Sequence, residues 1–404
     1  MTDLDAMHGT WQPRYQPVIE AAAAAIADAP PGGAALAVWV DGEPVLDVWG
    51  GLARPTEGRP WQRDTLAVGF SVAKGVLATC ALRAAQEGLL DLDEPCAAYW
   101  PAFAAHGKGD ITARMVLAHR AGLPALDAEF TLDQALDGSA IVTALEQQTP
   151  LWTPDTGYAY HAMTYGWLVA EIIRRASGRP LAEHLARITD TPSNDTWLGL
   201  PEDGSSRLAE AAWDPEHTDL RYPPDHPDTP WQQRTITRSV TLGDAFSPAL
   251  VGPGTGLNDP RVLRAGVPAV GIVSTARSMA ALWARTITST DGQQPVLNAE
   301  FVAEAARCRS EGETALNTPG AGRWAAGHMV RSTLAPMLSD NSFGHDGAGG
   351  QLCFADPAAG IGFAFLTNVL RNTHDDRSSR IVSALRDCLD ADISNDIFLG
   401  VTGS

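Results

Sequence analysis

Basic side chains are scarce in this 404-residue sequence. Its 29 Lys and Arg residues stand against 48 Asp and Glu residues, which gives a formal net charge of −19. No Lys/Arg-rich run interrupts this balance. Because nucleic acids attract proteins through clustered positive charge, we expect no nucleic-acid partner. The acidic balance also favours small neutral ligands over anionic ones.

Cysteine and long apolar runs are scarce as well. The cysteines are scattered, odd in number and without C-x-x-C spacing: Cys80, Cys96, Cys308, Cys353 and Cys388. This pattern is typical of reduced thiols in a cytosolic protein.

The first residues carry no basic region, so we expect no secretion signal, no membrane partner and a cytoplasmic location. No His, Asp or Glu spacing is typical of zinc, and we expect no metal and no other cofactor.

A serine and a lysine stand three positions apart after an apolar run. Ser71-Val72-Ala73-Lys74 follows residues 66–70 and opens a segment rich in Val, Leu and Ala, which predicts a buried helix over 71–87. In a helix this spacing places both side chains on one face. A serine needs such a neighbouring base to become a nucleophile, whereas a plain helix cap with a solvated lysine is the alternative. A lysine in a buried helix favours the first interpretation.

The order of the remaining patterns predicts an α+β fold. Residues 34–40 and 43–49 flank an Asp-Gly turn and predict a hairpin after a helix at 15–28. Helical periodicity covers segments near 112–119, 132–147 and 162–177. Strands are predicted again at 324–331, 350–354 and 361–366, before a last helix at 376–390. We therefore expect an antiparallel sheet built from both ends of the chain, flanked by helices, with a mostly helical subdomain inserted.

The corresponding domain boundaries are 1–70 with 320–404 for the sheet domain and 71–319 for the helical domain. Within the latter, residues 213–260 are rich in Pro and show no clean period. The segment contains His217, Trp231, Pro223, Pro224 and Pro227. We interpret it as an ordered wall of a pocket rather than a linker.

Two further segments carry polar or glycine-rich patterns. Tyr160 lies on a predicted loop just before the 162–177 helix. Near the other end, a glycine-rich segment leads into the strand that begins at 350, and its glycines let a ligand approach the backbone: Phe343-Gly344-His345-Asp346-Gly347-Ala348-Gly349-Gly350. Each pattern taken alone also suits simple packing or a simple turn.

Three elements follow one another along the chain: Ser71 with Lys74, then Tyr160, then the glycine-rich segment 343–350. In this order they resemble the superfamily of serine β-lactamases, penicillin-binding proteins and family VIII carboxylesterases, in which S-x-x-K is the first motif. Residues 110–124, 160–185, 271–277 and 360–368 are similar to the same family, so the resemblance spans residues 12–390. It implies a β-lactamase/transpeptidase-like fold.

The resemblance also implies roles for single residues. Ser71 would be the acyl-accepting nucleophile, and Lys74 and Tyr160 its general bases. The backbone N–H groups of Ser71 and Ala348 would form the oxyanion hole. Substrate contacts are expected from the residues His345, Asp346, Gly347, Ala162 and Trp231. His119 is expected to stabilise the helical layer rather than to touch substrate.

Two departures from the β-lactamase motifs shape the expected activity. Ala162 stands where those enzymes carry Asn, and His345 stands where they carry Lys. Both changes remove polar anchors for a β-lactam and favour a carboxylesterase that cleaves short-chain or aryl esters. The alternatives are an acyltransferase, an amidase or D-aminopeptidase, or a peptide cyclase using the same acyl-enzyme, with weak β-lactam hydrolysis as a side activity. A non-catalytic binding relative is the remaining class.

Overall fold

The structure is a computed structural model. It describes residues 6–28, 31–192, 194–216, 226, 228–318, 322–371 and 375–401, with side chains up to 390 in the last range. His217, Pro223, Pro224 and Pro227 of the predicted pocket wall lie outside the described residues.

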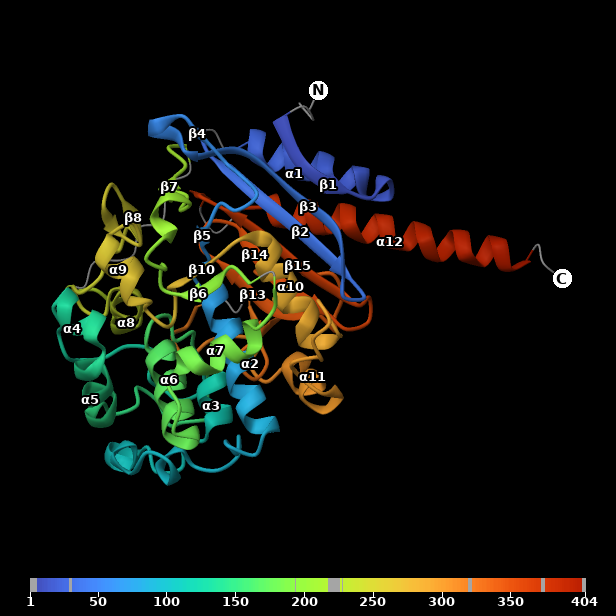
Figure 1. Ribbon diagram of the computed structural model, residues 1–404. Coiled ribbons are helices and arrows are strands. Elements are labelled where there is room, and N and C mark those ends of the chain that lie inside the picture. Colours follow the sequence, from blue (N-terminus) through green and yellow to red (C-terminus); the bar gives the residue numbers. More distant parts are fainter. Residues whose placement is uncertain are drawn as a thin grey trace.

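One large antiparallel sheet forms the centre of the fold, and its strands come from both ends of the chain (Figure 1). Across the sheet their order is β1 (Met7–Trp11), β3 (Glu43–Arg54), β2 (Gly33–Val40), β15 (Ile361–Thr367), β14 (Gln351–Asp356), β13 (Phe343–Gly347), β12 (Met329–Val330) and β11 (Arg323–Trp324). A short strand, β4 (Arg59–Pro60), pairs with β3. The predicted α+β class is confirmed.

Helices cover both faces of this sheet. On one face lie α1 (Gln16–Ala27) and α12 (Arg377–Val401), and on the other lie α10 (Ala276–Ile287) and α2 (Val72–Gln86) (Figure 1). Side chains alternate between the faces along each strand. Leu36 and Val38 therefore join the core under α1, whereas Ala37 and Trp39 join the core under α10. No helix among the described residues has an apolar stretch long enough to cross a bilayer.

The region between the two sheet-forming parts is mainly helical. It holds α3 (Ala113–Leu117), α4 (Leu132–Asp137), α5 (Ser139–Gln147), α6 (Thr164–Ser177), α7 (Leu181–Thr189), α8 (Trp231–Thr241), α9 (Pro260–Ala265) and α11 (Ala299–Ala306). A small sheet that the sequence did not predict joins β5 (Ala67–Val68), β10 (Ile272–Ser274) and β6 (Thr196–Leu198). The proposed domain boundaries at 70 and 320 stay a prediction.

Three predicted elements are wrong in detail. The helix expected over 132–147 is two helices, because Gly138 adopts a left-handed φ of 78° between α4 and α5. The strand expected over 324–331 is two short strands, β11 and β12, with Gly327 at φ 88° between them. Much of the glycine-rich segment 343–350, in which no strand was predicted before 350, is strand β13, which pairs with β14 over its whole length.

The expected irregular wall at 213–260 contains the helix α8. Its buried residues all carry hydroxyl side chains: Thr235, Thr237, Ser239 and Thr241. Three of these hydroxyls donate to carbonyls of their own helix, so they are buried without losing hydrogen bonds. This composition hides the helical period from a search for apolar residues.

Candidate active site

A sharp turn delivers Ser71 from the small sheet to the start of α2. Strand β5 pairs with β10, and the Gly69 N–H donates to the Ile272 carbonyl at 2.8 Å. The next residue, Phe70, is buried and has a φ of +48°, a region that a bulky side chain seldom adopts. Strain of this kind often occurs at functional sites. The Ser71 hydroxyl makes no capping hydrogen bond to α2, so the plain-cap alternative does not describe it.

Lys74 reaches Ser71 from one turn further along α2. Its Nζ lies 3.2 Å from Ser71 Oγ and donates to the Ala269 carbonyl at 3.0 Å. The side chain is fully buried, and this burial lowers the pKa of Lys74 to about 7, against the opposing effect of the Asp346 carboxylate. A substantial fraction of this amine is therefore neutral near pH 7 and able to accept a proton.

Tyr160 completes this group from the loop before α6. Lys74 Nζ lies 5.0 Å from the centre of the Tyr160 ring. The centre of the same ring is 6.1 Å from that of His345 and 6.0 Å from that of Trp324. The structure thus brings together Ser71, Lys74 and Tyr160, which are separated by up to 89 positions in the sequence.

Strand β13 packs against α2 and carries the third predicted element. His345 is fully buried, and its Nδ1 lies 2.8 Å from the Asp346 carbonyl and 3.1 Å from Asp346 Oδ1. Its Nε2 has no hydrogen-bond partner among the described residues. The close packing of α2 against β13 requires the glycine at position 75, because a β-carbon there would lie 3.2 Å from His345 Cβ. The Asp346 side chain is 36% exposed.

The end of β13 touches the turn that carries Ser71. A β-carbon at Gly347 would lie 2.6 Å from the Gly69 carbonyl oxygen and 3.3 Å from Val72 Cγ2. Ala348, which is partly buried, follows directly. The backbone at 347–348 and the start of α2 are therefore neighbours, as an oxyanion hole formed by Ser71 and Ala348 requires.

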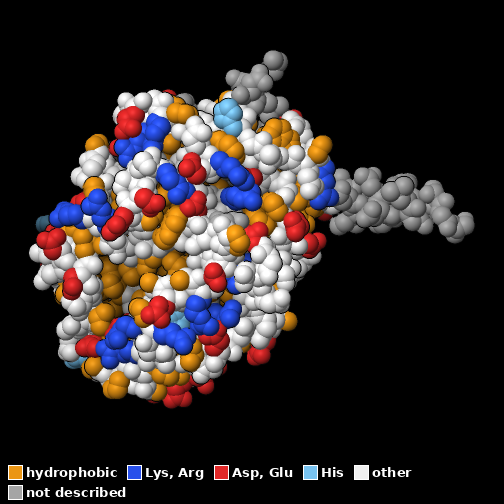
Figure 2. Space-filling view, in the orientation of Figure 1, with side chains coloured by type: hydrophobic (Ala, Val, Ile, Leu, Met, Phe, Trp, Pro, Cys, Tyr) orange, Lys and Arg blue, Asp and Glu red, His pale blue; other side chains and the backbone are white. Residues whose placement is uncertain are grey.

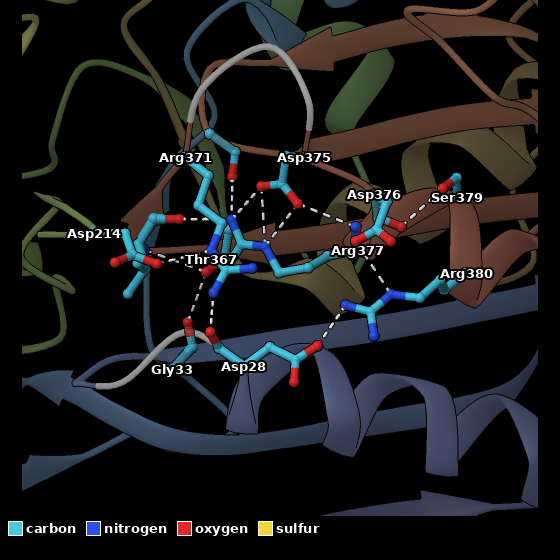
Figure 3. Close-up of polar contacts among 12 residues, drawn as sticks. Asp28, Gly33, Asp214, Thr367, Arg371, Asp375, Asp376, Arg377, Ser379 and Arg380 are labelled. Carbon is cyan, nitrogen blue, oxygen red and sulfur yellow. Dashed lines mark hydrogen bonds and ion pairs between the residues drawn. The ribbon is translucent and has the colours of Figure 1, made fainter. Parts of the chain in front are cut away.

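A buried arginine network holds the turn that contains Ala348. Arg377 donates to the carbonyls of Gly349 at 2.6 Å and Val369 at 2.8 Å, and it pairs with the buried carboxylate of Asp375. Figure 3 shows Arg377 and Asp375 beside a second ion pair, formed by the partly buried Arg371 and the buried Asp214. Because Arg377 bonds the carbonyl next to Ala348, the start of α12 fixes the turn after β13.

We predict that Gly347→Ala lowers kcat about 10- to 100-fold and destabilises the fold by about 1–3 kcal/mol. The added methyl group would meet the Gly69 carbonyl, a rigid backbone atom, and would push β13 away from Ser71. Steady-state kinetics and thermal unfolding measure the two effects. Gly109→Ala is the matched control, because a β-carbon there meets no atom within 4 Å. Wild-type kinetics in Gly347→Ala would contradict the close contact.

The last two predicted substrate contacts lie differently. Ala162 is partly buried and follows the fully buried His161. Trp231 begins α8 and is 49% exposed, and it makes none of the described ring contacts around Tyr160. The helix itself does approach the site, because the Met163 N–H donates to the Ser239 carbonyl at 3.1 Å.

The molecular surface is hollowed near this helix. Figure 2 shows a depression with hydrophobic side chains in its floor, in the part of the view where α6, α8 and β6 lie, with charged side chains on its rim. Among the described residues there is no cluster of three or more His, Cys, Asp or Glu side chains that could hold a metal ion.

Sequence reasoning missed several contributors to the site. Phe70, the Ala269 carbonyl and Trp324 all contact or position the central residues. The positive φ of Phe70 has no signal in the sequence, since bulky residues seldom adopt it.

A partly buried serine in contact with a fully buried lysine, between an antiparallel sheet and a helical layer, is the arrangement of a serine hydrolase of the β-lactamase and esterase type. The family model described as Beta-lactamase matches residues 22–386. The chain is 32% identical over 376 residues to the esterase/β-lactamase LipL of Mycobacterium tuberculosis (strain ATCC 25618 / H37Rv), covering 90% of this chain and 83% of that protein.

Solved structures agree with this assignment. A family VIII carboxylesterase is 27% identical with a TM-score of 0.82, covering 95% of this chain and 99% of that one. EstA from Arthrobacter nitroguajacolicus Rue61a is 28% identical with a TM-score of 0.81, covering 95% of this chain and 98% of that one. A penicillin-binding protein homolog from Caulobacter crescentus is 27% identical with a TM-score of 0.78, covering 95% and 99%. The chain belongs to the β-lactamase family, as the sequence motifs predicted.

Proposed function

We propose that this protein is a carboxylesterase that hydrolyses short-chain or aryl esters through an acyl-enzyme on Ser71. The observation that carries the proposal is the 3.2 Å contact between Ser71 Oγ and the Nζ of a fully buried lysine. The similarity to a family VIII carboxylesterase and to an esterase/β-lactamase supports the choice of ester substrates.

The proposed reaction begins when neutral Lys74 accepts the Ser71 hydroxyl proton and Oγ attacks the ester carbonyl. The carbonyl oxygen becomes an oxyanion, which the N–H groups of Ser71 and Ala348 would stabilise. The carbon–oxygen bond to the alcohol then breaks, and the alcohol leaves with a proton returned through Lys74 or Tyr160. Water, deprotonated by the same pair, attacks the acyl-enzyme and releases the acid and free Ser71.

The charges around Ser71 favour an uncharged acyl group. His345 occupies the third-motif position at which β-lactamases carry a permanent cation, and the next residue is an aspartate. The carboxylate of Asp346 is partly exposed and lies beside His345. A substrate carboxylate near this position would be repelled, whereas an alkyl or aryl group would not.

The proposal is tested with p-nitrophenyl acetate and butyrate, a chromogenic cephalosporin and a fluorophosphonate probe. We expect rapid ester hydrolysis, slow or no cephalosporin opening, and one phosphonyl adduct that mass spectrometry maps to Ser71. Hydrolysis without an adduct at Ser71 would contradict the proposed nucleophile. Products formed in the presence of methanol separate hydrolysis from acyl transfer, because methyl ester formation in place of free acid would identify a transferase.

We predict that Asp346 sets a preference against anionic acyl groups. Wild-type kcat/KM should be higher for p-nitrophenyl butyrate than for mono-p-nitrophenyl succinate, which has the same chain length and a carboxylate. Asp346→Asn should narrow this ratio about 3- to 10-fold, the effect of one partly exposed charge. Glu183→Gln, which changes an exposed acid on α7, is the matched control. An unchanged ratio in Asp346→Asn would refute the prediction.

A further inference from the structure

His119 occupies an unusual place behind Tyr160. It lies two residues after α3, is fully buried and has a φ of +60°. The sequence predicted only that it stabilises the helical layer. In the structure its ring centre lies 5.0 Å from that of Tyr160 and 5.7 Å from that of Trp324. The residue therefore belongs to the surroundings of the tyrosine.

Both peptide neighbours of Tyr160 are bonded to this one residue. The Ala159 N–H donates to the His119 carbonyl at 3.2 Å. The His161 N–H donates to His119 Nδ1, also at 3.2 Å. His119 thus holds the backbone immediately before and immediately after Tyr160, while its ring packs against the tyrosine ring.

His161 closes the same network from the other side. Its Nε2 accepts from the Leu123 N–H at 3.0 Å, and its Nδ1 donates to the Ala159 carbonyl at 2.6 Å. The Thr164 hydroxyl donates to the Leu123 carbonyl at 2.7 Å and so joins the start of α6 to the segment after α3. The loop that carries Tyr160 is therefore tied to residues 119–123 at several points.

These bonds fix the protonation of both rings. Nδ1 of His119 must carry a lone pair to accept from His161, so the proton lies on Nε2 and the ring is neutral. Burial lowers the pKa of His119 well below 6.5, and His161, His345 and Lys74 add to the effect. Burial likewise lowers the pKa of His161 to about 4. A second proton on His119 would remove its acceptor and place a charge beside Lys74.

The His119 Nε2 atom has no partner among the described residues. A buried N–H group without a partner is unfavourable, so the Nε2 atom does not explain the histidine at this position. The acceptor at Nδ1 does, because an aliphatic side chain could fill the volume but could not hold the His161 N–H.

We propose that His119 is a positioning residue that holds Tyr160 in register with Lys74 and Ser71 through its carbonyl and its Nδ1 acceptor. This inference rests on the proposed function, in which Tyr160 transfers protons. Loss of the acceptor would leave the fold in place but would let the tyrosine shift, and a displacement of about 1 Å is enough to slow a proton transfer strongly.

The test compares His119→Leu and His119→Asn in wild-type and Tyr160→Phe backgrounds, using kcat and KM for p-nitrophenyl butyrate. His119→Leu should lower kcat about 10- to 100-fold with a smaller change in KM. His119→Asn, whose amide oxygen can replace the Nδ1 acceptor, should restore most of this loss. In the Tyr160→Phe background His119→Leu should add less than about a threefold loss, because both changes disable the same proton transfer.

His184→Leu is the control for a purely structural role. His184 is also a buried histidine, on α7, and bonds the Ser177 hydroxyl at 2.8 Å. The His184→Leu variant should have a lower unfolding temperature than the wild type and, below that temperature, the same kcat.

Three results would overturn the inference. His119→Leu could have the kcat of the wild type, or His119→Asn could be as slow as His119→Leu. The third is that His119→Leu lowers kcat by the same factor in the Tyr160→Phe background as in the wild type. If Tyr160→Phe itself is as fast as wild type, the proposed role of Tyr160 fails, and this inference fails with it. A slow Tyr160→Phe with a fast His119→Leu overturns this inference alone.

Discussion

Replacing Ser71 by alanine is expected to lower kcat for p-nitrophenyl butyrate about 10,000-fold or more. The substitution removes the hydroxyl oxygen that lies 3.2 Å from Lys74 Nζ and that would form the covalent intermediate. The variant should keep the unfolding temperature of the wild type within a few degrees, since the Ser71 hydroxyl makes no capping bond to α2. Stopped-flow and steady-state assays at one enzyme concentration measure the loss.

Ser205→Ala is the matched control, because Ser205 is an exposed serine in a short helical turn outside the site. It should leave the rate and the fluorophosphonate adduct unchanged. Equal ester hydrolysis by Ser71→Ala and wild type, after purification on a column that has held no active enzyme, would show that Ser71 is not the nucleophile.

Replacing Lys74 should have an effect nearly as large. Lys74→Met and Lys74→Arg should lower kcat/KM about 1,000-fold or more, since neither side chain can accept the serine proton at neutral pH. The wild-type value should rise about tenfold per pH unit below pH 7 and level off above it. The reason is that the pKa of Lys74 is about 7 and only the neutral amine is a base. pH–rate profiles of kcat/KM check this expectation.

The sequence offers a direct way to observe this titration. It contains two lysines, Lys74 and Lys108, and both are fully buried. Protein labelled with carbon-13 at the lysine side chain should therefore give two NMR signals, of which one shifts near pH 7. Lys108→Met assigns the signals and is the matched control, because Lys108 Nζ only bonds the carbonyls of Ala105, Glu146 and Gln148. A Lys74 signal that titrates near pH 10 would contradict the proposed base.

The same pKa shift has a consequence for stability. Burial places the pKa of Lys74 in the folded protein at about 7, below its ordinary value of 10.5. Between these two values the unfolded chain binds more protons, so the free energy of unfolding contributed by this group rises with pH across that window. Lys74→Met removes this dependence and should be more stable than wild type at pH 7. Chemical denaturation at pH 7 and pH 9 tests the sign.

The parts of the fold set by local pattern could be predicted from the sequence. The hairpin of β2 and β3 follows from apolar segments on both sides of the Asp41-Gly42 turn, and α2 follows from an apolar run with a helix start. The contact between Lys74 and Ser71 is also local, because three positions along a helix set it. The spatial meeting of these residues with Tyr160 and His345 was predicted only from the family resemblance.

The features that arise from distant packing could not be predicted in this way. His345 lies in a strand because β13 pairs with β14, and its glycine-rich sequence has no strand pattern of its own. α8 was missed because its buried residues carry hydroxyl side chains instead of apolar ones. The hydrogen bonds of His119 depend on a left-handed backbone and on a loop 40 positions away, neither of which a local pattern reports.

The pairing of β2 with β15 has a consequence for how the protein is made. Ala34 pairs with Thr367, which is 333 positions further along the chain, and Ser71 therefore leaves the ribosome long before the strands that complete its surroundings. Contacts of such long range form slowly, because a large loop must close before they gain any stability. The proposed nucleophile can become active only after nearly the whole chain has been synthesised. A chain that stops before β13 would expose the apolar faces of β2 and α2, which makes premature termination a cause of aggregation rather than of a shorter enzyme.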